Sequence, residues 1–194
     1  MLYKFLSGLA KGVTHCIFRV KVVGKENVPK DGGMILAVNH KSNWDPIFAG
    51  AYCPRPLRFM AKADLFKNKL FGGLIKKLGA FPIQRGRGDI GAIKGAFSIL
   101  KNNDAMLIFP EGHRIKNGKR VKAKLGVSMI AVYAKVPVIP LCISGEYKPF
   151  QKVTVTFGKP ITFEEYYGKK PDNETLQTLA DEVMQTIYSF DNTD

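Results

Sequence analysis

The sequence predicts an α/β domain with a largely parallel central sheet flanked by helices. Short apolar runs of strand length alternate along the chain with longer segments of helical period. Hydrophobic residues make up 45% of the 194 residues and charged residues 24%, which is typical of a globular protein with a sizeable core. No internal repeat or linker divides the sequence, so we expect one domain over residues 18–194, preceded by a helix over residues 1–17.

The N-terminal segment, residues 1–17, predicts an amphipathic helix. Leu2, Phe5 and Leu9 fall on one side at about 100° per residue, and Lys4 and Lys11 fall on the other. Such a helix can pack on its own domain or lie in a membrane interface. The basic polar face and the aromatic residues near its start favour a membrane-interface helix that contacts an anionic surface.

The apolar patterns that follow predict strands and helices in alternation. Residues 18–24 alternate like a half-buried strand, and the continuous apolar run over residues 34–38 is typical of a buried one. Further strands are predicted over residues 57–61, 81–83, 105–109, 138–144 and 153–158, the last as an edge strand because its side chains alternate. Helices are predicted over residues 46–52, 63–78 with loops, 90–101, 122–134 and 173–190. This alternation favours a parallel sheet with helices on both faces.

The net charge of +14 indicates an anionic partner, such as anionic lipid, a phosphorylated or acidic ligand, or nucleic acid. From Ile161 onward the chain holds two basic and eight acidic residues, so the rest carries +20. Between Arg114 and Lys124 there are six basic residues and no acid; this run is either a solvated loop or a contact for anionic groups such as lipid headgroups. Aromatic residues do not alternate with the basic runs, so we expect no nucleic-acid partner.

The cysteines and the apolar segments limit the compartment, the metal content and the membrane topology that we expect for this protein. Cys16, Cys53 and Cys142 lie far apart in the sequence, so we expect neither a disulfide framework nor a zinc site. Unpaired cysteines of this kind favour a reducing compartment. No cluster of metal ligands and no nucleotide loop is visible, so we expect no metal and no cofactor. The sequence contains no run of about 18 apolar residues, so we expect no transmembrane helix. The N-terminus is unlike a signal peptide, so we expect none.

Four short motifs carry candidate chemistry. The sequence N-H-K-S-N-W-D, residues 39–45, follows a predicted buried strand, so His40 and Asp45 are candidates for a general base and its orienting partner. The others are G-A-F-P-I-Q-R at residues 79–85, F-P-E-G-H-R at 109–114 and V-P-V-I-P at 136–140. Taken singly, each has an ordinary explanation, such as a capping Asp beside a surface His, a solvated Arg, a turn, or the stiff start of a strand.

Taken in order, the four motifs resemble the blocks N-H-x-x-x-x-D, G-x-F-x-x-x-R, F-P-E-G-T-R and V-P-V-I-P of the PlsC-type glycerolipid acyltransferases, the 1-acyl-glycerol-3-phosphate acyltransferases. They span residues 39–140 of the 194. One departure is His113, where the family has Thr. A histidine there can still bond the turn or add a positive group near a phosphate.

The resemblance implies a role for each matched residue. His40 would deprotonate the acceptor hydroxyl, and Asp45 would orient and stabilise the imidazolium. Arg85 would hold the acceptor phosphate through its guanidinium, and Glu111 with Gly112 would belong to the glycerol-phosphate site. Further phosphate candidates, for which a solvated surface role is the alternative, are Arg114, Lys62 and Lys124.

The reaction implied by the resemblance moves an acyl chain from an acyl-CoA or acyl carrier protein thioester to the sn-2 hydroxyl of 1-acyl-glycerol-3-phosphate, giving phosphatidic acid. A relative that acylates glycerol 3-phosphate or another lysolipid is the alternative, and a catalytically silent lipid-binding protein is disfavoured because His40 and Asp45 are both present. The expected partners are lysophosphatidic acid, the acyl donor and an anionic membrane surface. The expected location is the cytoplasmic face of a membrane, as a peripheral or monotopic protein.

Overall fold

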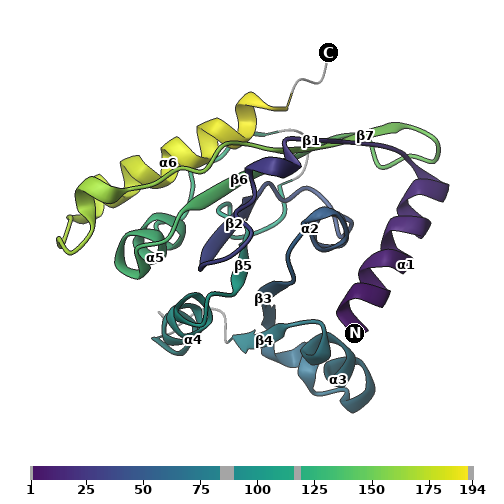
Figure 1. Cartoon of the computed structure of the whole chain (residues 1–194), viewed down its shortest axis with the longest axis horizontal. Coiled ribbons are helices and arrows are strands. Elements are labelled where there is room, and N and C mark those ends of the chain that lie inside the picture. Colours follow the sequence, from purple (N-terminus) through teal and green to yellow (C-terminus); the bar gives the residue numbers. More distant parts are fainter. Residues whose placement is uncertain (1, 84–89, 116–118, 192–194) are drawn as a thin grey trace.

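The described strands form a seven-stranded sheet in the order β1-β7-β6-β2-β5-β3-β4 (Figure 1). The computed structural model describes residues 2–83, 90–115 and 119–191. The strands are β1 Arg19–Val23, β2 Met34–Val38, β3 Leu57–Lys62, β4 Ala80–Ile83, β5 Ala105–Ile108, β6 Val138–Gly145 and β7 Lys152–Phe157. Neighbouring strands are parallel except for β6 and β7, so β1 and β7 run opposite to the other five.

Helices cover both faces of the sheet (Figure 1). One face carries α1 Leu2–Ile17, α2 Asp45–Tyr52 and α3 Lys69–Lys77, and the other carries α4 Ile90–Lys101, α5 Gly126–Ala134 and α6 Asn173–Ser189. Short 3-10 turns lie at η1 Lys25–Asn27, η2 Ala63–Phe66 and η3 Glu164–Tyr166. No helix in the described part of the chain is long and apolar enough to cross a membrane.

The central strand β2 is buried along its whole length, which explains its continuous apolar sequence. Side chains of a strand alternate between the two faces of the sheet. Leu36 packs in the cluster that contains Phe48 of α2, whereas Ile35 packs in the cluster that contains Val127 of α5 and Val183 of α6. The domain therefore has one apolar core on each side of β2.

The loops after β2 and β5 leave the sheet toward opposite faces. These strands are adjacent and parallel, with Ala37 opposite Ile108. The chain after β2 enters α2 on one face, and the chain after β5 leads to α5 on the other. Ligands of open α/β sheets bind in the crevice that such a reversal leaves at the carboxyl ends of the strands. The fold thus places residues 39–45 and 109–114 side by side at that crevice.

The predicted α/β class with a mainly parallel sheet is confirmed, but the position predicted for β7 is wrong. This strand lies between β1 and β6, and β1 forms the edge, with Val20 opposite Val153. The alternating side chains of β7 report that one of its faces is better covered than the other. They carry no information on whether both of its backbone edges are paired.

The predicted start of the helix after residue 121 is also wrong, because α5 begins at Gly126 instead of residue 122. The backbone before it is held by tertiary hydrogen bonds. The Ala123 N–H donates to Asp181 Oδ1 at 3.1 Å, and the Lys124 N–H donates to the Pro110 carbonyl at 2.7 Å. These bonds join the segment to α6 and to the loop after β5, and they outweigh its local helical pattern.

The helix α1 packs against α2 through its polar side. Thr14 is fully buried and bonds the Tyr52 hydroxyl at 2.8 Å, while the Ser7 hydroxyl donates to the Ala51 carbonyl at 3.2 Å. The predicted apolar side faces outward, and Phe5 and Leu9 are 69% and 56% exposed. The helix is therefore attached to the domain, and its apolar stripe is left uncovered.

Candidate active site

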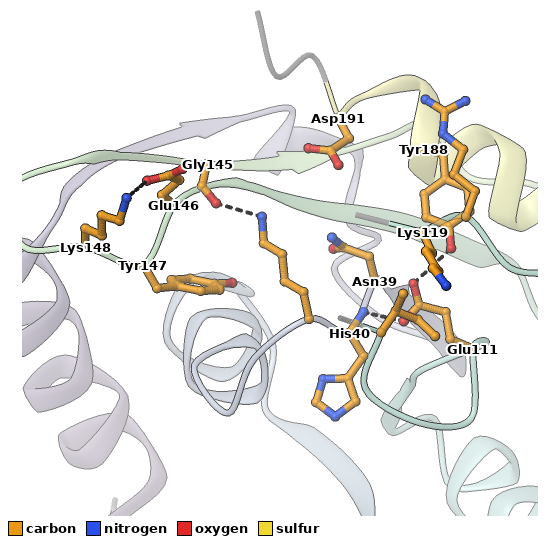
Figure 2. Close-up of a pocket in the computed structure, with 13 residues that line it drawn as sticks. Asn39, His40, Glu111, Lys119, Gly145, Glu146, Tyr147, Lys148, Tyr188 and Asp191 are labelled. Carbon is orange, nitrogen blue, oxygen red and sulfur yellow. Dashed lines mark hydrogen bonds and ion pairs between the residues drawn. The ribbon is translucent and has the colours of Figure 1, made fainter. Parts of the chain in front are cut away.

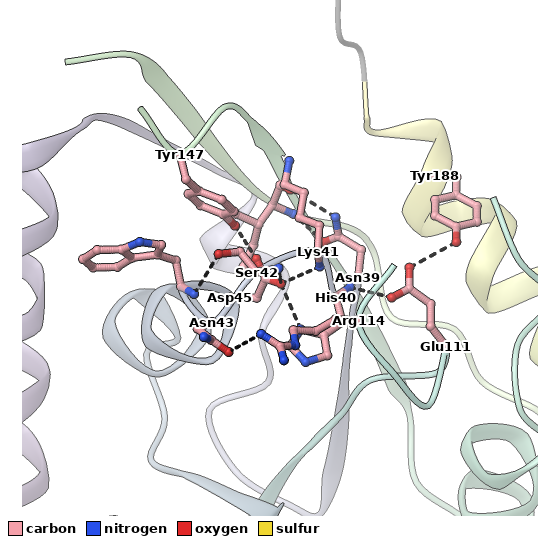
Figure 3. Close-up of polar contacts among 12 residues, drawn as sticks. Asn39, His40, Lys41, Ser42, Asn43, Asp45, Glu111, Arg114, Tyr147 and Tyr188 are labelled. Carbon is pink, nitrogen blue, oxygen red and sulfur yellow. Dashed lines mark hydrogen bonds and ion pairs between the residues drawn. The ribbon is translucent and has the colours of Figure 1, made fainter. Parts of the chain in front are cut away.

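His40 and Asp45 form a direct contact at the carboxyl end of β2 (Figure 3). The imidazole Nδ1 lies 2.9 Å from Asp45 Oδ2, and Asp45 is the first residue of α2. An imidazole that donates from Nδ1 to a carboxylate leaves Nε2 as the nitrogen that can accept a proton. No described residue forms a hydrogen bond with Nε2, and the His40 side chain is 18% exposed. This nitrogen is therefore available to a ligand.

The Asp45 carboxylate is fully buried and accepts hydrogen bonds at both oxygens. Besides the imidazole, Oδ2 accepts from the backbone N–H groups of Lys41 at 2.6 Å and Ser42 at 2.7 Å. Oδ1 accepts from the hydroxyl of Tyr147, which follows β6. Burial raises the pKa of the Tyr147 phenol and the Asp45 charge raises it further, so the hydroxyl keeps its proton and remains a donor. These donors fix the carboxylate that orients His40.

Glu111 holds the backbone of His40 from the neighbouring strand. It follows β5, is 3% exposed, and accepts the His40 N–H at Oε2 over 2.7 Å. Its other oxygen, Oε1, accepts from the Tyr188 hydroxyl of α6 at 3.1 Å. Burial raises the pKa of the Glu111 carboxyl, and burial also raises the pKa of Tyr188, to about 12. Both carboxylate oxygens are thus engaged inside the protein.

The imidazole ring and the start of its loop are held by three further contacts. Phe109 stacks on the imidazole, with ring centroids 4.0 Å apart and planes inclined by 21°. The Ile115 N–H donates to the His40 carbonyl at 2.7 Å. The Asn39 amide is buried and bonds both backbone groups of Ile143 in β6, at 2.8 and 3.0 Å. His40 is therefore positioned by β5 and β6 as well as by its own strand.

Three of the remaining predicted site residues lie at or beside the loops that hold His40 and Glu111, namely Gly112, Lys124 and Arg114. Gly112 has a φ of +76°, and an added Cβ would lie 3.1 Å from the Lys124 stem, so this turn favours glycine and places Lys124 beside it. Arg114 is exposed and donates to Asn43 Oδ1 at 2.8 Å, which brings it to the same loop as His40. Lys62 is the last residue of β3, which lies two strands from β2 in the sheet. Arg85 lies outside the described residues.

One cavity is lined in part by His40, and the lining of a second includes Pro46, the residue after Asp45. A polar cavity of about 560 Å³ lies beside the His40 backbone, and its lining includes Lys41, Arg120 and Tyr188. Figure 2 shows the imidazole at the edge of this group of residues, on the side away from Tyr188 and Asp191. The second cavity, of about 420 Å³, is an apolar groove between α1, α2 and α3. No three His, Cys, Asp or Glu side chains of the described segments lie together as a metal site would require.

Two tyrosines of the site were not predicted from the sequence. Tyr147 lies 102 residues from Asp45, and Tyr188 lies 77 residues from Glu111. Tyr147 follows a buried strand, as His40 and Glu111 do, so its position at the end of β6 was a usable signal. Tyr188 lies on α6, and nothing in its local sequence distinguishes it from a core aromatic residue.

Comparisons with known proteins bear on the family of this chain. The acyltransferase family model matches residues 19–144. The chain is 31% identical to the 1-acyl-sn-glycerol-3-phosphate acyltransferase of Bacillus subtilis, covering 98% of both chains. It is 33% identical to the protein of that name from Streptococcus pneumoniae, over 98% of this chain and 74% of the relative. It also resembles the crystal structure of the 1-acyl-sn-glycerophosphate acyltransferase PlsC from Thermotoga maritima, with a TM-score of 0.77 and 28% identity over 96% of this chain and 78% of that one.

The buried carboxyl of Glu111 gives the first testable prediction. Because burial raises its pKa above the ordinary 4.5, ionisation of Glu111 destabilises the fold, and this penalty grows as the pH rises from about that value through the raised pKa. Glu111→Gln removes the charge but keeps an acceptor for the His40 N–H. We expect the free energy of unfolding of Glu111→Gln to increase relative to wild type with rising pH over this window, as measured by urea unfolding.

The matched control is Glu146→Gln, since Glu146 is exposed and its pKa is lowered by Lys148. This variant should show no such relative gain with rising pH. A pH-independent difference between Glu111→Gln and wild type would contradict the assignment of a penalised charge at this position.

Proposed function

Because the chain belongs to the acyltransferase family, we propose that it transfers a fatty acyl chain from a thioester to the sn-2 hydroxyl of 1-acyl-glycerol-3-phosphate, giving phosphatidic acid. The observation that carries the proposal is the His40–Asp45 pair at the crevice between β2 and β5, with Nε2 free to take a proton. The family match and the names of the relatives support the acceptor. The donor is acyl-CoA or acyl carrier protein.

In this mechanism His40 is the general base. Nε2 takes the proton of the acceptor hydroxyl while the hydroxyl oxygen attacks the thioester carbonyl carbon. The tetrahedral intermediate collapses, the C–S bond breaks, and the imidazolium returns the proton to the leaving thiolate. Asp45 stabilises the imidazolium through Nδ1. General-base assistance of this kind contributes about 10²–10⁴-fold, and positioning of the two substrates supplies much of the rest.

The acceptor phosphate needs cationic partners near this crevice. Arg85 is assigned this role by its motif, and Arg114 and Lys124 adjoin the Glu111–Gly112 turn, where either can assist. Since both oxygens of Glu111 are bonded within the protein, we assign Glu111 to organising this turn and the His40 backbone.

The apolar groove is proposed to hold an acyl chain. Its lining includes Pro46, the residue after Asp45, so one end of the groove reaches the start of α2 where the His40–Asp45 pair lies. Most of the remaining lining is apolar and comes from α1, α2, α3 and two strands, with Leu6, Ile75 and Leu107 among its residues. An apolar lining that begins beside the base suits a long hydrocarbon chain whose reacting end lies at His40.

A peripheral location on a membrane is proposed from the exposed side of α1, and the three free cysteines favour its cytoplasmic face. Phe5 and Leu9 are more than half exposed on a helix that also carries Lys4 and Lys11. An amphipathic helix of this composition binds an anionic bilayer interface. The acyl groove then lies next to the lipid phase that supplies the acceptor.

The proposed reaction predicts that acyl transfer depends on His40. Acyl transfer from labelled acyl-CoA to detergent-dispersed lysophosphatidic acid should fall by about 10²–10⁴-fold in His40→Ala, because the hydroxyl then has no base. Asp45→Asn should also fall, because the amide cannot stabilise the imidazolium. His15→Ala, which removes an exposed histidine of α1, is the control and should retain activity. Full activity in His40→Ala would disprove the mechanism.

The phosphate assignment predicts a substrate-selective effect at Arg85. Arg85→Ala should raise the KM for lysophosphatidic acid by about 10-fold or more, because a charge-assisted pair with the phosphate is lost. The KM for the acyl donor should change little. Equal changes for both substrates, measured under the same conditions, would remove Arg85 from the phosphate site.

The groove assignment predicts a graded change of chain-length preference at Gly50. This residue lines the groove from α2, and an added Cβ would meet only the Tyr3 hydroxyl, at 3.7 Å. Gly50→Ala, Gly50→Val and Gly50→Leu should shift preference progressively toward shorter acyl chains, while thermal unfolding shows the fold intact, since glycine is a poor helix former.

Chain-length series of donor and acceptor are assayed separately, and the substrate that responds is the one whose chain occupies the groove. An unchanged preference for both substrates in Gly50→Leu would place both acyl chains elsewhere.

A further inference from the structure

The outer side of α3 is an exposed apolar ridge in a basic setting. Leu70 and Leu74 lie one turn apart on this helix and are 88% and 43% exposed, and Leu65 of the preceding turn is 44% exposed. The inner side is packed, with Ile75 8% exposed and Gly72 against the Phe66 backbone. The helix is thus anchored to the domain by one side and presents leucines on the other. We call Leu65, Leu70 and Leu74 the α3 ridge.

The charges around the α3 ridge are mainly positive. Exposed lysines flank it at both ends of the helix, namely Lys67, Lys69, Lys76 and Lys77. Over residues 63–78 the sequence has one acid, Asp64, which pairs with Lys67 at 2.7 Å. Three lysines therefore remain without an acidic counterpart in the same segment. Leucines flanked by lysines match a bilayer interface with anionic headgroups, where the apolar side enters the acyl boundary and the ammonium groups meet phosphates.

The α3 ridge lies on the same face of the sheet as α1. Both helices line the apolar groove, which takes Tyr3 and Leu6 from α1, Ile75 from α3 and Leu78, the residue after α3. Figure 1 shows the start of α1 beside α3. Phe5 of α1 and Leu70 of α3 therefore point outward from the two helices whose other sides line one groove.

We propose that the α3 ridge is a second bilayer contact, separate from α1, and that the two together seat the protein with the groove between them at an anionic lipid surface. This inference rests on the proposed use of a lipid substrate, for which it defines the membrane-facing surface. Two contacts fix an orientation, whereas α1 alone would let the domain rotate about one helix. The groove then exchanges acyl chains with the lipid phase, and the crevice at His40 stays at its edge.

The test measures binding of the full chain to two kinds of vesicle, phosphatidylcholine alone and phosphatidylcholine with a minority of phosphatidylglycerol. Leu70→Ser combined with Leu74→Ser should lower the partition coefficient about 10-fold for both kinds, because apolar contact is lost. Lys76→Gln combined with Lys77→Gln should lower it about fivefold per lysine on the anionic vesicles only. Tyr133→Ser, on α5 of the opposite face, and the pair Lys169→Gln with Lys170→Gln, before the start of α6, are exposed controls, and their binding should equal that of wild type.

Wild-type binding by both α3 variants would overturn the inference and leave α1 as the single contact. A changed oligomeric state of the leucine variant in size-exclusion chromatography, with unchanged vesicle binding, would also overturn it and assign the ridge to a second copy of the chain. Acyl transfer to detergent-dispersed lysophosphatidic acid is measured in parallel and should be retained by the α3 variants. Absence of transfer by wild type would contradict the proposed function and would leave the binding result standing on its own.

Discussion

The buried carboxylate of Asp45 is the constraint on which the site depends. An ion in this position would cost several kcal/mol without partners, and each hydrogen bond to a charged group contributes about 1.5–3 kcal/mol. Its four donors are the Lys41 and Ser42 backbone, the His40 imidazole and the Tyr147 hydroxyl. The bonds that stabilise the buried charge are therefore the same ones that hold the imidazole. Loss of a donor affects both the stability of the fold and the orientation of the His40 imidazole, and with it the position of Nε2.

The second support of His40 comes from across the sheet. Since β2 and β5 are in register, Glu111 follows β5 at the level where His40 follows β2, and its carboxylate reaches the His40 N–H. Tyr188 connects this carboxylate to α6 and also accepts the Val121 N–H at 3.3 Å. The C-terminal helix, which is acidic and distant in sequence, thus helps to set the geometry of a basic crevice. Its contribution acts through the position of Glu111.

Much of the fold and the central pair could be predicted because they follow local patterns. The run Met34–Val38 identified the buried strand, and the spacing of His40 and Asp45 matches one loop between a strand and a helix. Contacts between distant segments could not be predicted. Tyr147 and Tyr188 gain their roles from tertiary placement, and the bonds of Ala123 and Lys124 to Asp181 and Pro110 delay the start of α5. Pairing at both edges of β7 likewise depends on β1, more than a hundred residues earlier.

The orientation of α1 was left open by its sequence, and the structure gives a physical reason to connect it with lipid. Burial of a Leu or Phe side chain contributes about 1.5–3 kcal/mol, yet α1 buries Thr14 and leaves Phe5 and Leu9 exposed. Its attachment uses hydrogen bonds from Tyr3 and Ser7 to the Gly50 carbonyl, next to the groove. This arrangement forgoes apolar burial in water and recovers it when the exposed stripe meets another apolar phase. At the membrane location that we propose, a bilayer beside the groove would supply that phase and the acyl chains together.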